Sequence, residues 1–218
     1  MQSLKDTAGF RNNSIDLNKK IILKIDFYSR DTALVAVELI GKLLARKLDG
    51  KILSGIIVET EAYYGLDDPA SHAFKGRTKR AEIMFGKPGT AYVYFCYGMY
   101  YMLNTVTENE NIPGAVLIRA VQPVEGLDEM FERRRTENIK NLTNGPGKLT
   151  AALGVNLNDN GKNLTDENSG LNIYDIFIEK SKLKISNSSR IGISAGTERQ
   201  LRFYLADTNF LYCYKGQV

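Results

Sequence analysis

Few residues in this sequence are of the kinds that build metal centres or disulfide frameworks. The 218 residues include two cysteines, Cys96 and Cys213, a single histidine, His72, and no tryptophan. Two cysteines are too few for a four-cysteine zinc site, an iron–sulfur cluster or a disulfide framework. A histidine-based zinc site or a serine–histidine–aspartate triad would have to be built around one ring. These site types are therefore disfavoured, and we expect the cysteines to be two buried thiols of a reducing compartment, with a single bridge between them as the alternative.

Long apolar segments are also missing. Residues 1–18 are polar and contain no apolar segment of a signal peptide. The apolar run over 91–103 is too short to span a bilayer and contains five tyrosines. With 43% hydrophobic and 25% charged residues, the composition is that of an ordinary globular protein. We therefore expect one compact domain in the cytoplasm, with no membrane contact.

The formal net charge is only +4, but the charges are unevenly distributed along the chain. Residues 59–68 carry four acidic side chains and no basic one: Glu59, Glu61, Asp67 and Asp68. Residues 75–87 carry five basic side chains against the single Glu82: Lys75, Arg77, Lys79, Arg80 and Lys87. This order indicates a carboxylate site beside a track for a polyanion. On charge alone, two solvated loops are the simpler interpretation.

Hydrophobic periodicity predicts an α+β protein with a mixed, mostly antiparallel sheet and helices packed around it. Asp31 is expected to cap a helix whose apolar positions are Leu34, Val37, Ile40, Leu43 and Leu44. The predicted strands cover 52–61, 90–97, 100–107, 115–121, 183–185, 191–194 and 201–205, with a hairpin turn at Gly98-Met99. Two further helices are expected over 125–135 and 147–153, and a surface loop over 156–172. We assign residues 1–28 to an N-terminal arm and residues 29–218 to a single domain.

The strand that ends near residue 61 carries two carboxylates. Side-chain alternation places Glu59 and Glu61 on one face of this strand, opposite to Val58 and Thr60. Such a pair could serve as the acid and base of a glycosidase, which needs roughly 5–9 Å between its carboxyl groups. A strand end could equally leave both side chains in water, and a surface pair is the more common case.

Aromatic residues are concentrated in one short segment. Five tyrosines lie within ten residues: Tyr92, Tyr94, Tyr97, Tyr100 and Tyr101. Tyr92 and Tyr94 share a strand face, and Tyr97 falls at the hairpin turn. Core packing and a surface for stacking nucleobases explain this cluster equally well, because a tyrosine hydroxyl is poorly suited to full burial.

Two further features have an ordinary structural interpretation as well as a functional one. The segment 144–150 leads into a predicted helix, whose free N–H groups would attract phosphate, but its glycine spacing before Lys148 differs from that of a P-loop. A turn that starts a helix is an equally good interpretation. His72 lies in a loop between the carboxylates and the basic residues, and a lone loop histidine is most often structural or exposed.

In combination, these segments resemble the alkyladenine (3-methyladenine) DNA glycosylase family that bacteria and vertebrates share. The resemblance runs in order from about residue 30 to 205, which is far more specific than any single motif. Its segments are Val58-Glu59-Thr60-Glu61-Ala62-Tyr63, His72, Phe85-Gly86-Lys87-Pro88-Gly89-Thr90, Tyr92-Val93-Tyr94, Tyr97-Gly98-Met99-Tyr100, Asn104, Val116-Leu117-Ile118-Arg119-Ala120, Gly145-Pro146-Gly147-Lys148-Leu149, Arg190-Ile191-Gly192-Ile193 and Leu201-Arg202-Phe203-Tyr204. The resemblance implies a curved sheet surrounded by helices, with a protruding β-hairpin.

The resemblance also implies the catalytic roles. Glu61 would be the general base that activates a water, and Arg119 would orient both the carboxylate and the water. The backbone carbonyl of Ile191 would hold the same water. Glu59 has no catalytic role by this analogy, and no metal, other cofactor or covalent lysine intermediate is needed.

The remaining implied roles concern DNA. Tyr63, His72 and Tyr94 would sandwich an extruded base, Tyr97 would fill the gap it leaves, and Asn104 would reject a purine with a 2-amino group. Basic side chains would grip phosphates: Lys75, Arg77, Lys79, Arg80, Lys87, Lys148 and Arg202.

The function that the resemblance implies is base-excision repair by a monomer acting on double-stranded DNA. The enzyme would flip an alkylated purine out of the duplex and hydrolyse its N-glycosidic bond, leaving an abasic site. Whether deaminated purines are also substrates is open at this point. Two alternatives of other classes are a non-catalytic protein that binds damaged DNA and a sugar glycosidase that uses Glu59 and Glu61.

Overall fold

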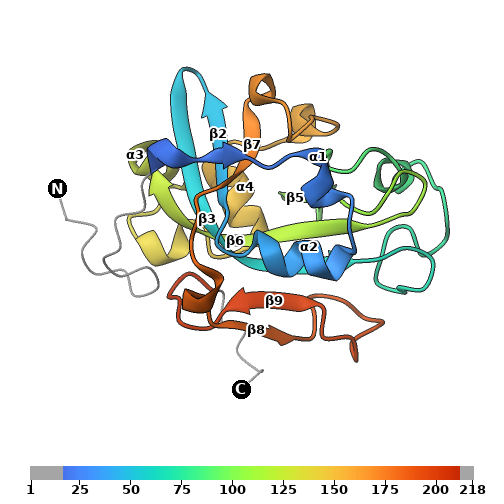
Figure 1. Ribbon diagram of the computed structural model, residues 1–218. Helices are drawn as coiled ribbons and strands as arrows, with labels where there is room; N and C mark the ends of the chain where they lie inside the picture. Colours follow the sequence, from blue (N-terminus) through green and yellow to red (C-terminus); the bar gives the residue numbers. More distant parts are fainter. Residues whose placement is uncertain (1–16, 212–218) are drawn as a thin grey trace.

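The computed structural model describes residues 17–211, which form a curled antiparallel sheet with short helices packed against it (Figure 1). The strands are β1 (Ile21–Ile22), β2 (Leu43–Leu48), β3 (Lys51–Tyr63), β4 (Ala91–Cys96), β5 (Tyr100–Val106), β6 (Ala115–Glu125), β7 (Leu171–Asp175), β8 (Ile185–Ser188) and β9 (Arg202–Leu205). Their order is β1-β7-β2-β3-β6-β5-β4, and β9 pairs with both β3 and β8. Every strand pair in this described part is antiparallel. The predicted α+β class is therefore confirmed.

The long strand β3 organises the sheet because it changes partners along its length. Its first half pairs with β2 and its end, from Glu59 to Glu61, pairs with β9, while β6 lies along its other edge. The register with β6 shifts on both sides of Glu59. Such irregularities re-aim side chains out of the regular alternation. The two acidic residues of β3 thus lie where the sheet is least regular.

The first long helix is shorter than the sequence predicts. Asp31 caps α2 (Thr32–Leu39) through its side chain, which accepts a hydrogen bond from the Leu34 amide. The helix ends there, and the predicted continuation through Leu43 and Leu44 is wrong, because both residues begin strand β2. The buried face was also predicted wrongly, since Leu34 is exposed and the buried positions are Thr32, Val35, Ala36 and Leu39. Four alanine or valine residues make α2 apolar all round, so periodicity alone could not identify its inner face.

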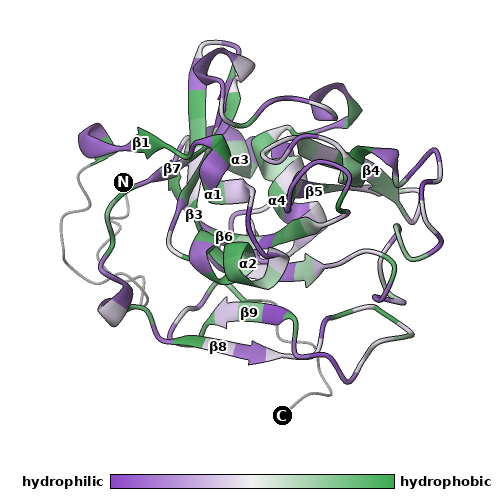
Figure 2. Ribbon diagram, turned by 45° about the vertical axis from the view of Figure 1, so that its right-hand side comes forward, coloured by the Kyte–Doolittle hydropathy of each residue, from purple (hydrophilic) through white to green (hydrophobic). Residues whose placement is uncertain are grey.

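Three more helices are described, together with six short 3₁₀ turns. The helices are α1 (Ile25–Tyr28), α3 (Leu127–Arg134) and α4 (Pro146–Leu153). The 3₁₀ turns are Leu17–Lys19, Glu82–Phe85, Ile139–Asn141, Leu157–Asp159, Glu167–Ser169 and Lys180–Lys182. Helix α4 packs on β5 and β6, α2 packs on β3, and α3 packs on α4. Apolar colour in Figure 2 follows the inner strands and α2, whereas the connecting loops are mostly polar.

Two predictions for the second half of the chain are wrong. Residues 171–175 form β7 between β1 and β2, although they were assigned in part to the 156–172 loop. Residues 191–194 are not a strand but part of the loop that joins β8 to β9. Short strands of four or five residues carry too few alternations to be distinguished from loops in the sequence.

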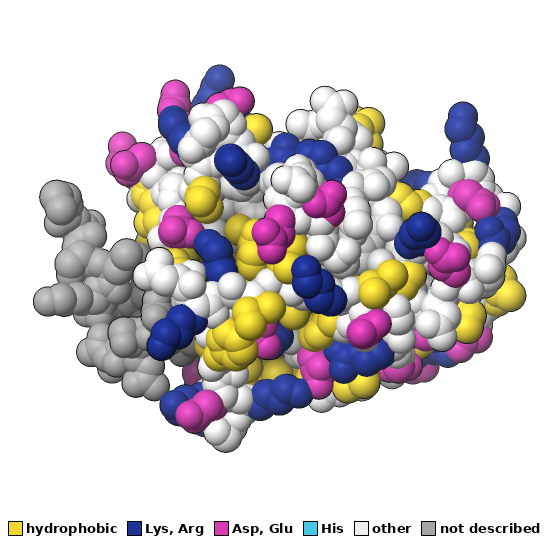
Figure 3. Space-filling model, turned by 45° about the horizontal axis from the view of Figure 1, so that its top comes forward, with side chains coloured by type: hydrophobic (Ala, Val, Ile, Leu, Met, Phe, Trp, Pro, Cys, Tyr) yellow, Lys and Arg dark blue, Asp and Glu magenta, His cyan; other side chains and the backbone are white. Residues whose placement is uncertain are grey.

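The surface on the face seen in Figure 3 carries intermixed acidic and basic side chains with small apolar patches between them. No field of a single charge sign covers that face. Among residues 17–211, no helix has the length and apolar character needed to cross a membrane. Of the two cysteines, Cys96 is a free, half-buried thiol, and Cys213 lies outside the described residues.

Candidate active site

The two carboxylates of β3 are fully buried, and they share one arginine. Glu59 and Glu61 are both 0% exposed. Arg119, from the neighbouring strand β6, donates from Nε to Oε1 of Glu59 at 2.8 Å. Its NH1 group lies 3.2 Å from Oε2 of Glu61. The sequence interpretation of a solvated surface pair is therefore wrong, and the placement of both carboxylates on one side of the strand agrees with the alternation argument.

Glu59 belongs to a buried ion-pair cluster whose other members are Glu61, Arg119 and Arg202. Its Oε1 also accepts a hydrogen bond of 2.6 Å from Nε of Arg202 in β9, and its Oε2 has no partner among the described residues. Two carboxylates and two guanidinium groups cancel in charge, which is the condition for burying them together. Glu59 is committed to the buried guanidinium groups of Arg119 and Arg202, so a glycosidase pair made of Glu59 and Glu61 loses support.

Glu61 is held by three donors. The Tyr63 hydroxyl donates to Oε2 at 2.8 Å, and the backbone amide of Ile191 donates to Oε1 at 2.7 Å. With the Arg119 contact, these donors stabilise the ionised carboxylate and fix its orientation. Burial would lower the pKa of Arg119, but the charges of Glu61 and Glu59 outweigh it and hold that pKa above its usual range. The Arg119 side chain therefore stays positively charged beside Glu61.

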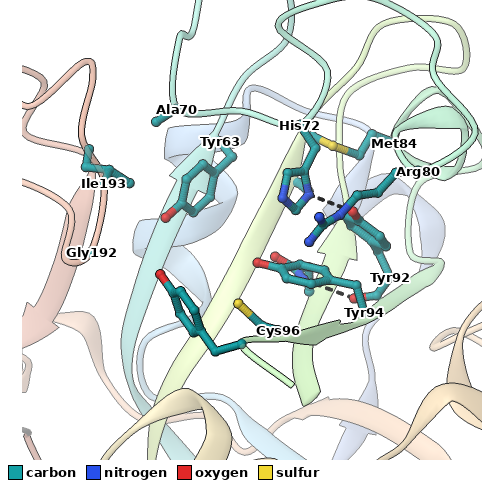
Figure 4. A pocket seen from close by; sticks show the side chains of 13 residues that line it. Tyr63, Ala70, His72, Arg80, Met84, Tyr92, Tyr94, Cys96, Gly192 and Ile193 are labelled. Carbon is teal, nitrogen blue, oxygen red and sulfur yellow. Dashed lines mark hydrogen bonds between the residues drawn. The ribbon is translucent and has the colours of Figure 1, made fainter. Parts of the chain in front are cut away.

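A cavity of 160 Å³ lies beside the ring of Tyr63, which forms part of its wall (Figure 4). Four parts of the chain supply its walls: the end of β3 with the loop that follows, the β4–β5 hairpin, the start of β6, and the loop after β8. Its lining side chains are Tyr63, Ala70, His72, Arg80, Met84, Tyr92, Tyr94, Cys96, Tyr97, Asn104, Ala115, Gly192 and Ile193. Tyr63 is the link between the two halves of the site, because its ring faces the cavity and its hydroxyl bonds Glu61.

His72 is a neutral wall of this cavity. Its ring lies edge-on to Tyr94, with 4.8 Å between the centroids, and its Nδ1 is 2.7 Å from the Tyr92 hydroxyl. Burial, together with the nearby charge of Arg80, lowers the pKa of His72 to about 4. The ring therefore carries no charge at neutral pH.

The aromatic walls each have an arginine beside them. The guanidinium of Arg190 lies 4.6 Å from the centroid of the Tyr63 ring, and that of Arg80 lies 4.8 Å from the centroid of Tyr94. Burial raises the pKa of both tyrosine hydroxyls above the ordinary value, so both remain protonated. Contacts of this kind hold a ring in place while leaving its opposite face available for another partner.

Asn104 occupies an interior position of β5 and is only 3% exposed. Its Nδ2 donates to the Tyr92 carbonyl at 3.0 Å, on the strand directly opposite. No other described group donates to its Oδ1, so this oxygen is available to a ligand in the cavity. Among the neighbouring tyrosines, Tyr92 is buried, Tyr94 lines the cavity and Tyr97 is exposed.

The loop after β3 is locked by a buried ion pair. Arg190 bonds both oxygens of Asp68, at 2.6 and 2.7 Å, and also donates to the Ala62 carbonyl at 3.0 Å. Both side chains are fully buried. Asp68 in turn accepts from the amides of Tyr64 and Ala70. This bidentate pair fixes the loop that leads to His72 and orients the segment that delivers Ile191 to Glu61.

The tip of the β4–β5 hairpin is the most exposed aromatic part of the site. Tyr97 is 78% exposed and has a positive φ of 53°, next to Gly98 at 67°. Three residues, 97–99, connect the strands, and Met99 is also exposed. A large apolar ring held away from the body of the domain has no role in the core, and it borders the cavity.

The seven candidate phosphate contacts differ in their surroundings. Lys75, Lys79 and Lys87 are exposed and make no ion pair within the described part of the chain. Arg77 is also exposed but bonds Glu82 and Asn111, and Arg80 faces the cavity rather than solvent alone. Lys148 donates to Asn144, in the turn that begins α4 (Pro146–Leu153).

Arg202 is the member of that set whose position argues against phosphate contact. It is buried, and its guanidinium is committed to Glu59 and to the Ser188 hydroxyl. Arg202 is therefore not a candidate phosphate contact. The interpretation of the acidic segment as a solvated loop is likewise wrong for Glu59, Glu61 and Asp68, which are all buried.

Sequence reasoning missed three residues that shape the site. Arg190, Tyr92 and Arg80 were not expected to lock the loop, bond the histidine or line the cavity. For Tyr92 a signal existed, because it shares a strand face with Tyr94. For Arg190 the partner is 122 residues away in sequence, and no local pattern indicates such a pair.

Comparison with known proteins gives one consistent result. A family model described as methylpurine-DNA glycosylase (MPG) matches residues 26–209, which include every residue of the carboxylate cluster and of the cavity. Relatives from three bacteria are each named "Putative 3-methyladenine DNA glycosylase". The Rickettsia felis protein is 46% identical over 191 residues, which cover 88% of this chain and 97% of the relative. The proteins of Clostridium perfringens (strain SM101) and Chlorobium phaeobacteroides are each 44% identical and cover 85% of this chain, with 96% and 92% of the relative matched.

Proposed function

We propose a mechanism from the premise that this chain belongs to the methylpurine-DNA glycosylase family. The enzyme hydrolyses the N-glycosidic bond of an alkylated purine such as 3-methyladenine and leaves an abasic site in duplex DNA. It acts as a monomer. The observation that carries this proposal is the buried carboxylate of Glu61, which is separated from an aromatic cavity only by its hydrogen-bonding partner Tyr63.

The cavity takes up the damaged base after it rotates out of the duplex. Extrusion costs about a few kcal/mol and costs least for a base that pairs poorly. Stacking on an aromatic side chain returns about 1–3 kcal/mol for each base, so Tyr63, His72 and Tyr94 offset the cost. The exposed Tyr97 at the hairpin tip fills the vacated space and limits unstacking of the neighbouring bases.

Glu61 acts as the general base. Its carboxylate takes a proton from a water that attacks the sugar carbon, and Arg119 and the backbone carbonyl of Ile191 orient that water. General-base assistance typically accelerates a reaction by about 10²–10⁴-fold. The same negative charge stabilises the positive charge that grows on the sugar. A purine that is already cationic leaves readily, so one carboxylate is sufficient.

Asn104 sets selectivity at the floor of the cavity. Because its Nδ2 is engaged by the Tyr92 carbonyl, it meets the base with its oxygen or with its side-chain plane. A 2-amino group, as in guanine, would crowd this buried side chain, whereas adenine derivatives lack that group. Selectivity for adenine-type lesions over normal guanine follows.

DNA binding rests on the exposed lysines of the loop between β3 and β4. Lys75, Lys79 and Lys87 are the best candidates for phosphate contacts, because they have no ion-pair partner in the described structure. Each phosphate contact steepens the fall of affinity with salt by about one unit of slope. Replacing the three by glutamine should weaken binding at low salt and flatten its salt dependence, without changing which base is released.

The decisive experiment measures base release from methylated duplex DNA and, in parallel, from a duplex with a single hypoxanthine. Glu61→Gln keeps the shape of the side chain but removes the negative charge, and its amide nitrogen cannot accept a hydrogen bond from the donors around Glu61. Release by this variant should fall by at least about 100-fold while DNA binding is retained. The matched control is Glu179→Gln, an exposed carboxylate whose partner is Lys182 and which should leave the rate unchanged.

The possible outcomes distinguish the three candidate functions. Equal release by Glu61→Gln and by the unmodified protein would remove Glu61 from the mechanism. Tight binding to lesion-containing DNA with no base release by the unmodified protein would favour a non-catalytic binder. Hydrolysis of small glycosides, with no release from DNA, would favour a sugar glycosidase. The hypoxanthine arm decides whether deaminated purines are substrates.

A further inference from the structure

The side chain of Arg190 contacts both the main chain and the ring that adjoin the Glu61 carboxylate. Its NH1 group donates at 3.0 Å to the carbonyl of Ala62, the residue after Glu61. Its guanidinium lies 4.6 Å from the ring centroid of Tyr63, whose hydroxyl donates to Glu61. The residue that follows Arg190 is Ile191, whose backbone amide donates to the other oxygen of Glu61 at 2.7 Å. Two of the three donors that hold Glu61 therefore adjoin Arg190.

Asp68 fixes the orientation of Arg190. Its two oxygens accept from NH1 and NH2 at 2.6 and 2.7 Å, and this bidentate geometry sets the plane of the guanidinium. Both side chains are fully buried. Burial would lower the pKa of Arg190, but the hydrogen bonds and the charge of Asp68 outweigh it and hold that pKa above its usual range, so Arg190 stays charged.

Folding stability alone is a poor explanation for this buried pair. Two apolar side chains of similar volume often stabilise a protein as well as a buried ion pair does. The Nε group of Arg190 is also buried without a hydrogen-bond partner in the described part of the chain, which costs free energy of folding. What an apolar pair cannot supply is direction, because the planar guanidinium points its N–H groups at Asp68 and at the Ala62 carbonyl together.

We propose that Arg190 is a positioning residue for catalysis: acting through Tyr63 and the Ile191 peptide, it holds the Glu61 carboxylate in the orientation that takes the proton from water. The inference rests on the proposed function and adds a residue to its mechanism. Arg190 does not line the described cavity, whereas Tyr63 and the two residues after Ile191 do (Figure 4). Its effect therefore reaches the reaction only through these neighbours. A displacement of a reacting group by about 1 Å can lower a rate by about 100-fold.

The first test separates the chemical step from DNA binding. Base release from duplex DNA carrying 3-methyladenine is measured in a single turnover with saturating enzyme, well below the Tm of each variant. Affinity is measured on a duplex with a tetrahydrofuran abasic analogue. Arg190→Met should lower the single-turnover rate by about 10- to 100-fold and leave the affinity unchanged. Arg190→Lys keeps a charge opposite Asp68 but loses the planar fork, so its rate should still fall by about 10-fold.

Arg199→Met is the matched control. Arg199 belongs to the same loop and pairs with Asp67, the neighbour of Asp68, but this pair is accessible to solvent. The control should have the rate and the affinity of the unmodified protein. An unchanged rate in Arg190→Met, a loss of affinity without a loss of rate, or an equal fall in Arg199→Met would each overturn the proposal.

A double variant distinguishes positioning from folding stability. Arg190→Met combined with Asp68→Asn leaves neither charge of the buried pair. Its Tm should therefore be higher than that of Asp68→Asn alone, in which the guanidinium stays buried without a counter-charge. Its rate of base release should nevertheless be as low as that of Arg190→Met. A rate that recovers to that of the unmodified protein would show that Arg190 acts through stability alone.

A second readout needs no substrate. Hydrogen exchange of the Ile191 amide, followed by NMR on protein labelled with ¹⁵N-isoleucine, reports whether its bond to Glu61 is intact. The amide of Ile57 in β3 donates to the Lys42 carbonyl at 2.8 Å and serves as the reference for the stability of the domain. The two signals are assigned by their loss in Ile191→Val and in Ile57→Val.

Arg190→Met should accelerate exchange at Ile191 by at least about 10-fold more than at Ile57, because the opening is local. Arg199→Met should change neither rate of exchange. Equal acceleration at both amides in Arg190→Met would contradict a positioning role. If the unmodified protein releases no base, the proposed function fails, whereas the exchange ratio still decides whether Arg190 positions the Ile191 donor to Glu61.

Discussion

The buried cluster around Glu59 allows one prediction to be worked out in detail, the effect of Glu59→Gln. This substitution keeps the size of the side chain and removes one of two negative charges that balance two guanidinium groups. Arg119 and Arg202 then share only Glu61, and the buried cluster carries a net charge of about +1. Breaking a buried ion pair by neutralising one partner costs about 3–5 kcal/mol, because the remaining charge stays buried without compensation.

The expected loss is large enough to measure by two methods. For a domain of this size, each kcal/mol corresponds to about 2–4 °C in Tm, so Tm should fall by about 6–20 °C. Urea unfolding should give a lower midpoint at an unchanged slope, which would show that the change is in stability alone. Base release should persist well below the new Tm, because Glu61 keeps its contacts with Arg119, Tyr63 and the Ile191 amide.

A double-mutant cycle tests the reason for the loss. Glu59→Gln combined with Arg202→Met restores the charge balance, since Arg119 and Glu61 remain as a pair. The double variant should therefore be less destabilised than the sum of the single variants, by about 1–3 kcal/mol. A Glu59→Gln protein within about 1 kcal/mol of the unmodified one, or simple additivity in the cycle, would refute the view that Glu59 serves as the counter-charge.

Three further predictions concern the surroundings of the site. Asp68→Asn should destabilise the domain by about 3–5 kcal/mol in thermal unfolding, because it leaves the buried guanidinium of Arg190 without a counter-charge. Burial alone would raise the pKa of Asp68, but Arg190 holds it below its usual 3.8, so the stabilisation is present above pH 3.8 and is lost as the pH falls below that value. A variant as sensitive to acid as the unmodified protein would contradict this explanation. Gly147→Ala should lower Tm by an amount equivalent to about 1–3 kcal/mol, because a Cβ there would lie 2.6 Å from the Tyr100 ring; an unchanged Tm would mean that this half-exposed ring moves aside freely. His72 should make the domain less stable as pH falls from 6.5 to about 4, since in this window the unfolded chain binds a proton that the folded ring does not, and Tm measured against pH should have a shallower slope in His72→Phe.

The order and type of most elements were predictable because they depend on local patterns. The capping by Asp31, the β3 strand, the β4–β5 pair and the helices after residues 125 and 145 are all visible in the sequence at short range. The exceptions include the end of α2, the short strand β7 and the loop over 191–194, which was predicted to be a strand. In α2 the apolar residues are spread around most of the helix and strand β2 follows with similar residues, so periodicity does not reveal the boundary; the local signal is Gly41, which has a φ of 87° directly after the last residue of the helix cap, Ile40.

Residue types at the site were also readable, whereas their partners were not. The sequence by itself singled out two glutamates at the end of a strand, one histidine and a tyrosine-rich hairpin as candidate site residues. Only the tertiary structure decided that Glu59 accepts from both Arg119 and Arg202, and that Glu61 bonds Tyr63, whose ring lines the cavity. The difference arises at the register shifts of β3 around Glu59, where regular alternation no longer specifies the surroundings of a side chain.

The long sequence distances between these partners explain why the sequence alone does not identify them. The Ile191 amide and Arg202 lie 130 and 143 residues from the carboxylates that they bond. Such pairs form because a buried charge must find a compensating partner somewhere in the folded chain, and nothing in the local sequence specifies which one. Local pattern therefore determined most of the elements, and the burial of charge in the assembled sheet determined that Glu59 pairs with Arg202 and that Glu61 bonds Tyr63.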